Sequence, residues 1–177
     1  MKDWKGALAR LHPHLLAWIW TGLLILQMIL AFFFFTDPRS QALRVAGWAI
    51  WAMGTVFAIL PIFALRARGG VPKGKSYMET TALVDTGIYA IARHPQGGTA
   101  GLLFSLALAL IGQHWLIVVL AVVGIALVYL DTFKADEACI EKFGPQYVDY
   151  MQRVPRVNFV AGILRLLMRS RPESSEV

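Results

Sequence analysis

Residues 15–35 read LLAWIWTGLLILQMILAFFFF, an apolar run of 21 residues without a charged side chain. As an α-helix this run would be about 31 Å long, at 1.5 Å per residue. That length matches the hydrocarbon core of a bilayer. The run is too long for the apolar part of a signal peptide, and no small-residue cleavage site follows it. We therefore expect an uncleaved first transmembrane helix.

Three further apolar runs follow, and we expect spans at 43–65, 99–113 and 115–133. The third run is short for a span, so it is predicted to form a tight hairpin with the fourth and to lean on the first two helices. The fourth helix is expected to leave the membrane and to end near Phe143, before Gly144-Pro145. The sequence thus predicts one all-α membrane domain, residues 1–177, with about four transmembrane helices and a helical C-terminal tail.

The composition supports a membrane protein and argues against several other classes. Hydrophobic residues make up 57% of the chain and charged residues 16%, with a mean hydropathy of +0.57. A soluble domain carries about 25% charged residues. The net charge of +6 is not assigned to nucleic-acid binding, because excess Lys and Arg in a membrane protein belong first to its cytoplasmic loops. The single cysteine excludes an internal disulfide, and no metal site is expected.

The basic residues also predict the topology. Arg39 and Arg44 lie between the first two spans, and the other 15 of the 17 basic residues lie in the N-terminus, the loop 66–96 and the tail 134–177. With four spans these three segments share one side, which the positive-inside rule makes the cytoplasm. We expect a multi-pass protein of the plasma (inner) membrane with both termini cytoplasmic. Residues 163–168, with flanking arginines, form an amphipathic segment suited to an anionic membrane surface.

The string LVDTGIYAIARHP, residues 83–95, comes directly before the third span. It places Arg93 and His94 at the N-terminus of a membrane helix, where free N–H groups and the helix dipole favour an anion. The alternative is that this basic pair faces lipid headgroups.

A second feature is the string FKADEACI, residues 133–140, on the emerging fourth helix. Glu137 interrupts an apolar helical stripe and would need a cation, such as Arg93, Lys134 or a positively charged ligand group. The alternative is that Asp136 and Glu137 are a solvated pair at the membrane exit. Together the basic and acidic features describe a site for a zwitterion, and an amino-acid-like ligand follows.

Ordered motifs over about half of the chain resemble one known family. They are Leu83-Val84-x-x-Gly87-x-Tyr89-x-x-x-Arg93-His94-Pro95, then Asp136-Glu137, then Phe143-Gly144-x-Gln146-Tyr147-x-x-Tyr150-x-x-Arg153-Val154-Pro155. This pattern is similar to the isoprenylcysteine carboxyl methyltransferase and phospholipid methyltransferase family. The resemblance implies a helical membrane enzyme that binds S-adenosylmethionine from the cytosolic side and methylates lipophilic substrates.

The resemblance also implies the site residues. Those expected to bind the cofactor are Val84, Gly87, Tyr89, Arg93, His94, Pro95, Asp136 and Glu137. The expected catalytic residues are His94, Tyr89 and Arg153, with Arg153 a candidate for contacting an anionic acceptor through its planar guanidinium. Two positions depart from the family: Gly97 replaces a usual aromatic, and Asp136 replaces the first residue of a usual Glu-Glu pair.

The sequence leaves the acceptor open. A prenylcysteine carboxylate or a thiolate needs no strong base, whereas a phospholipid amine must first lose a proton to His94, Tyr89 or Asp136. The leading expectation is an isoprenylcysteine carboxyl methyltransferase-like enzyme, with phospholipid N-methylation or lipophilic thiol S-methylation as alternatives. A nicotinamide-dependent reductase is a second enzyme hypothesis, because membrane sterol reductases resemble the same C-terminal core. It ranks behind the methyltransferase, because those reductase chains are longer. A non-catalytic scaffold bound to membrane lipids is the alternative of another class.

Overall fold

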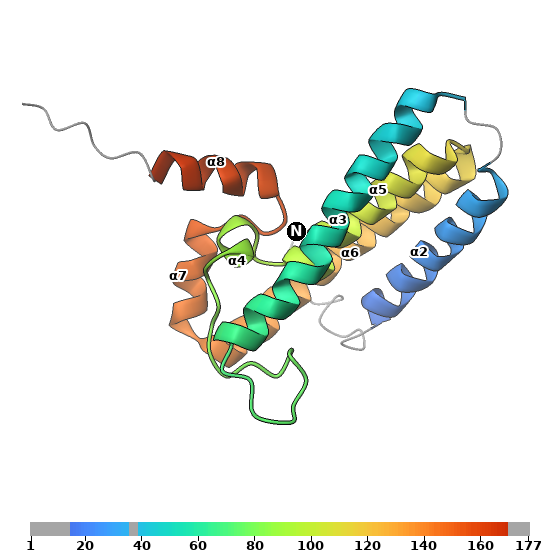
Figure 1. The fold of residues 1–177 in the computed structure, drawn as a ribbon. Coiled ribbons are helices and arrows are strands. Elements are labelled where there is room, and N and C mark those ends of the chain that lie inside the picture. The colour runs from blue at the N-terminus through green and yellow to red at the C-terminus, as the bar shows by residue number, and fades with distance from the viewer. Residues whose placement is uncertain (1–14, 36–38, 170–177) are drawn as a thin grey trace, which may run out of the picture.

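The structure, a computed structural model, describes residues 15–35 and 39–169 (Figure 1). All regular structure in these residues is helical, and four helices are long and apolar enough to cross a membrane, which confirms the predicted fold class. These four are α2 (Leu15–Phe33), α3 (Gln41–Arg68), α5 (Gly101–Gly112) with the preceding π-helical turn η1 (Pro95–Ala100), and α6 (Trp115–Phe143). The shorter helices are α4 (Ile88–Ile91), α7 (Pro145–Arg153) and α8 (Phe159–Arg169).

Helix α5 lies at the centre of the bundle. It packs against α3, α6 and α2, and its membrane segment is 61% buried, whereas the segments of the other three helices are 17–28% buried. Small residues allow the close approach. A Cβ atom at Gly47 of α3 would lie 2.8 Å from Cγ1 of Ile111 and 3.0 Å from the carbonyl oxygen of Ala107. The short third span is therefore the core of the bundle.

Polar groups join the helices at two levels. Gln27 of α2 is fully buried, and its Nε2 donates to the backbone carbonyl of Ile117 at 3.2 Å and to that of Ser105 at 3.4 Å. At the end where α3 begins, the backbone of Ser40 exchanges two hydrogen bonds of 2.7 Å with the side chain of Gln113. Such bonds are favoured because lipid offers no alternative partner.

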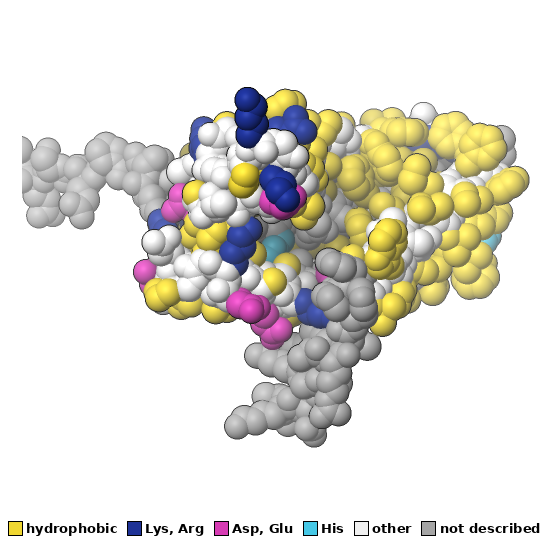
Figure 2. Space-filling model, turned by 90° about the horizontal axis from the view of Figure 1, so that it is seen from below, with side chains coloured by type: hydrophobic (Ala, Val, Ile, Leu, Met, Phe, Trp, Pro, Cys, Tyr) yellow, Lys and Arg dark blue, Asp and Glu magenta, His cyan; other side chains and the backbone are white. Residues whose placement is uncertain are grey.

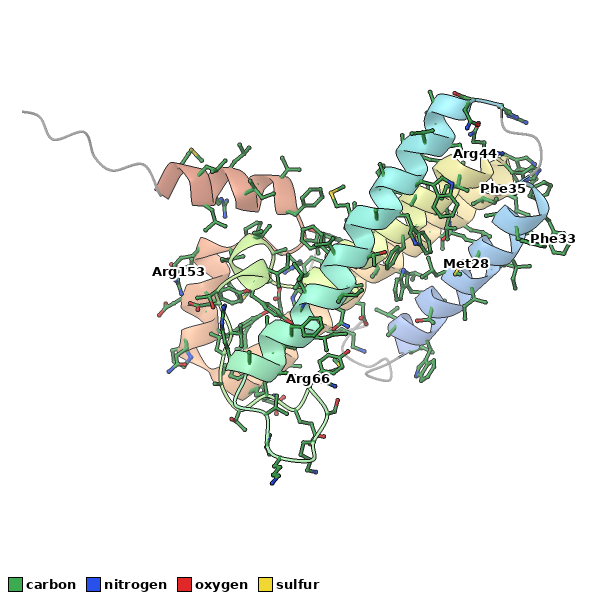
Figure 3. The ribbon with its side chains drawn as sticks, viewed as in Figure 1. Met28, Phe33, Phe35, Arg44, Arg66 and Arg153 are labelled. Carbon is green, nitrogen blue, oxygen red and sulfur yellow. The ribbon has the colours of Figure 1, made fainter. Side chains whose placement is uncertain are left out.

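The opposite end of the bundle carries the irregular segments. Arg44 and Arg66 mark the two ends of α3, and α4, α7 and the loop after α3 gather at the Arg66 end (Figure 3). There the chain after α7 forms backbone hydrogen bonds with the segment before α5, a pairing that we call the clasp. Arg93 N donates to Pro155 O and His94 N to Arg156 O, both at 3.0 Å. The Arg-His pair is thereby held by backbone pairing as well as by its neighbours in sequence.

The element boundaries differ from the expectation mainly around the loop 66–96. Helix α3 continues to Arg68, and the loop contains the single turn α4. The third helix begins with the π-helical turn η1 at Pro95, so Arg93 and His94 directly precede it. Helix α6 ends at Phe143, where Gly144 adopts φ 62°. The termini, 1–14 and 170–177, which the topology expectation includes, lie outside the described residues.

Candidate functional site

A cavity of about 350 Å³ opens at the end of the bundle where α3 and α6 finish. Its walls come from the end of α3, the loop before α4, the segment 93–98, α6 and α7. Seen from this end, the surface is hollowed, a histidine shows inside the hollow, and Lys, Arg, Asp and Glu surround it (Figure 2). The volume lies within the range of small-molecule sites.

The carboxylate of Asp136 organises the wall of this cavity. It is 3% exposed. Oδ1 lies 2.7 Å from His94 Nε2 and accepts a hydrogen bond of 2.7 Å from the Tyr147 hydroxyl. Oδ2 accepts a hydrogen bond of 2.8 Å from Arg156 Nε and lies 2.8 Å from Arg156 Nη2 in the same ion pair. A buried carboxylate needs such partners, so Asp136 is a satisfied structural centre.

Arg156 is held in turn by an aromatic ring. Its guanidinium carbon lies 3.6 Å from the centroid of Phe133, within the range of a cation–π contact. Arg156, Asp136 and His94 thus form a chain that fixes the imidazole at the cavity.

Arg93 contributes the groups best suited to a ligand. Its side chain is 7% exposed, and Nη1 lies 3.4 Å from Asp136 Oδ1. Within the described residues neither Nε nor Nη1 donates a hydrogen bond. Arg93 lines the cavity. Because buried N–H donors without acceptors are costly, this arginine fits an anionic ligand group such as a carboxylate.

One face of α6 supplies the opposite wall. Asp131, Ala135, Cys139 and Lys142 line the cavity at spacings of four, four and three residues. This is the period of a helix face. Glu137 lies two residues beyond Ala135 and therefore on the far side of the helix, where it is exposed. Among the described residues, Asp131 is the one acidic residue that lines the cavity.

Three tyrosines close the site next to α7. Burial raises the pKa of Tyr89, Tyr147 and Tyr150, so these hydroxyls stay protonated at neutral pH. The Tyr150 hydroxyl donates to the carbonyl oxygen of Tyr89 at 2.6 Å, which ties α7 to α4. Tyr147 and Tyr150 thus donate their hydroxyl protons within the protein, and none of the three tyrosines is a base.

The structure brings together some of the predicted site residues. Val84, Tyr89, Arg93, His94 and Pro95 line the cavity, and Asp136 lies behind His94. The other predicted residues, Gly87, Glu137 and Arg153, are not among the lining residues.

Arg153 faces outward from α7 (Figure 3), and its Nη2 pairs with Asp85 Oδ2 at 3.2 Å on the surface. Gly87 begins α4 with φ 64°, a conformation that favours glycine.

Other residues of the site were missed by the sequence analysis. They are Arg156, Asp131, Cys139 and Lys142. The four-residue spacing from Asp131 to Cys139 is a readable signal for the lining face of α6. No comparable signal singles out Arg156, which reaches Asp136 from a non-helical segment. A Cβ atom at Gly98 would lie 2.6 Å from Val157 Cγ1, a contact created only by the clasp.

Four apolar helices long enough to cross a membrane, with a mostly apolar cavity that contains Arg93 at one end of the bundle, describe a multi-pass membrane protein with a candidate ligand site at that end. The chain matches the phospholipid methyltransferase family over residues 43–143, more than half of its length, and belongs to that family. This confirms the resemblance drawn from the motifs. No curated protein and no solved structure matches the chain. Membership implies a methyltransferase that acts on lipid-type substrates.

Proposed function

We propose that this protein is an S-adenosylmethionine-dependent methyltransferase whose cofactor binds in the cavity beside Arg93 and whose acceptor is a lipophilic molecule. The observation that carries the proposal is Arg93, a buried arginine of the cavity wall whose Nε and Nη1 donate no hydrogen bond within the described residues. When bound, S-adenosylmethionine would supply an electrophilic methyl group on a sulfonium. Its amino-acid end is a zwitterion, which is the ligand chemistry expected from the sequence.

The residues that would hold the cofactor divide by charge. Arg93 would hold the carboxylate through its guanidinium group, in a site where desolvation strengthens the pairing. Asp131 would face the ammonium, because it lines the same cavity. Glu137, the residue expected from the sequence, is exposed on the other side of α6, so it is the alternative to Asp131 for that role.

His94 is the residue suited to move a proton. Asp136 accepts a hydrogen bond from Arg156 within an ion pair, so it is a carboxylate and accepts the Nε2–H of His94. Nδ1 of His94 then remains as the nitrogen that can take a proton from the substrate that is methylated. Asp136 is itself fully occupied, so it is not available as the base.

The acceptor is proposed to enter from the membrane, because the cavity lies where apolar helix surface meets the polar end of the bundle (Figure 2). A Cβ atom at Gly97 would meet nothing within 4 Å, so there is open space at the cavity wall where the family usually has an aromatic side chain. That space suits a bulky lipophilic acceptor. We take an isoprenylcysteine-type carboxylate as the leading acceptor.

A phospholipid amine is the second candidate, and the His94–Asp136 pair favours it because an ammonium must lose a proton before methyl transfer. A hydrophobic thiol would need only a weaker base than the ammonium to become the thiolate that is methylated. Arg153 remains a proposed contact for an anionic acceptor headgroup approaching from the surface. We propose that the cavity end is cytoplasmic, in a protein of the plasma (inner) membrane, because basic residues gather at that end.

The cofactor assignment is tested by titrating the purified protein in nanodiscs with S-adenosylhomocysteine, the demethylated cofactor. We expect micromolar binding. Asp131→Asn should weaken it at least tenfold, and the matched Glu137→Gln should leave it unchanged. Equal dissociation constants for the wild type and Asp131→Asn, with loss in Glu137→Gln, would return the ammonium to Glu137. No binding to the wild type would refute the proposed function.

The acceptor is tested by measuring transfer of a labelled methyl group into a prenylcysteine analogue, phosphatidylethanolamine and a long-chain thiol. Turnover of the carboxylate acceptor supports the leading candidate. If only the amine is methylated, with a rate that falls when His94 is replaced by Gln, the second candidate is correct. Turnover of water-soluble acceptors alone would refute entry from the membrane.

A further inference from the structure

Helix α8 carries an apolar face that no described part of the protein covers. Its large apolar side chains are 39–66% exposed: Val160, Ile163, Leu164, Leu167 and Met168. Their spacing of three and four residues gathers them on one side of the helix. An exposed stripe of this kind on a short helix marks a surface that contacts another apolar phase.

The opposite side of α8 packs against α4 at Gly162. Gly162 is buried, and a Cβ atom there would lie 1.8 Å from the carbonyl oxygen of Ile91 in α4. Helical geometry places Leu164 and Val160 about 160–200° around the axis from Gly162, at 100° per residue. The apolar stripe therefore points away from α4.

The start of α8 is anchored in the membrane bundle. The ring of Phe159 lies 5.2 Å from that of Phe57, a buried residue of α3. Asn158 caps the helix, with Oδ1 accepting from Ala161 N at 3.0 Å. In Figure 1, α4 and α7 lie on one side of α8, and no described element lies on the other. The first residue of α8 thus packs on the membrane bundle, and the apolar stripe follows directly after it.

We propose that α8 is an interfacial helix that lies in the headgroup region of the leaflet nearest the cavity and binds anionic lipid there. Its occupant is lipid because the stripe begins at a membrane helix and because basic residues accompany it. Arg165 is exposed, and the sequence adds Arg169 and Arg171. An apolar stripe with flanking arginines binds by apolar burial and by attraction to anionic headgroups.

The contact between Gly162 and Ile91 gives this membrane contact a consequence for the site. Ile91 lies two residues before Arg93, and α4 also carries Tyr89 of the cavity wall. Membrane-bound α8 therefore buttresses the turn that presents Arg93 and His94. This part of the inference rests on the proposed function, whereas the membrane contact does not.

The membrane contact is tested with spin labels on Leu164→Cys and Leu167→Cys in nanodiscs of phosphatidylcholine and phosphatidylglycerol. Arg165→Cys is the matched control, and the wild type, whose Cys139 is half-buried, gives the background. We expect the labels at 164 and 167 to be accessible mainly to oxygen, which concentrates in the membrane. The label at 165 should be accessible mainly to a water-soluble nickel chelate. Chelate access at both apolar positions would overturn the proposal, as would immobilisation of both labels by a protein neighbour.

Replacing phosphatidylglycerol by phosphatidylcholine should raise chelate access at 164 at least twofold, and no change would overturn the anionic-lipid part. The buttress is tested by S-adenosylhomocysteine binding. Gly162→Ala should weaken it at least tenfold, and Ala161→Ser should not. Equal affinity in both variants would overturn the buttress, whereas absence of binding in the wild type would overturn the proposed function and leave the label result standing.

Discussion

The most exacting prediction compares two neighbouring carboxylates of α6. Asp136→Asn removes the charge that pairs with Arg156 and Arg93, and it weakens the acceptor of the His94 and Tyr147 hydrogen bonds. Asp136 is 3% exposed, so the two guanidinium groups would remain buried without a counter-charge. Breaking a buried ion pair from one side costs about 3–5 kcal/mol. We expect a loss of stability of that size.

The control is Glu137→Gln, the adjacent residue on the exposed side of the same helix. Exposed substitutions of this kind stay within about 0.5 kcal/mol of the wild type. Both variants can be measured by reversible unfolding in mixed detergent micelles, with helical circular dichroism as the signal. A change of less than about 1 kcal/mol for Asp136→Asn would refute the assignment of Asp136 as a structural centre. An equal loss in Glu137→Gln would refute the placement of the two residues on different faces.

Three further predictions follow from the same geometry. Gly98→Ala should cost about 1–3 kcal/mol through overpacking against Val157, whereas Gly97→Ala should be neutral, and equal melting temperatures would contradict the clasp. Tyr150→Phe should lose about 1 kcal/mol, the value of its hydrogen bond to Tyr89, and unchanged unfolding would show that α7 is held in another way. Because the pKa of Tyr147 and Tyr150 is raised in the fold, their contribution to the free energy of unfolding should be constant below a pH of about 10 and fall above it; Tyr147→Phe should reduce that alkaline fall, and an identical alkaline limb would count against the burial of this hydroxyl.

The sequence was sufficient for the bundle because the lipid imposes a simple rule. A run such as 15–35 must be helical in a bilayer, and its length determines whether it spans. The end of α6 at Phe143 was likewise readable, since Gly144 and Pro145 cannot continue a helix. The central position of α5 was not readable, because it depends on which small residues meet across helices.

The site was predictable where its residues are consecutive and unpredictable where they meet through the fold. Arg93 and His94 adjoin the third span in sequence, and they do line the cavity. Asp136 and Glu137 are also consecutive, but a helix turns 100° between them, so one is buried and the other is exposed. Arg156 joins the site only because the chain after α7 pairs with residues 93 and 94. Its role could not be read from periodicity.

The central claim, that the cavity beside Arg93 is the cofactor site of a membrane methyltransferase, is tested most directly by an experimental structure in nanodiscs with S-adenosylhomocysteine. We predict the ligand between the segment 93–98 and the face of α6 that carries Asp131, with its carboxylate within hydrogen-bond distance of Arg93 Nε and Nη1. A ligand bound at any other place on the protein, or one whose carboxylate does not contact Arg93, would contradict the account.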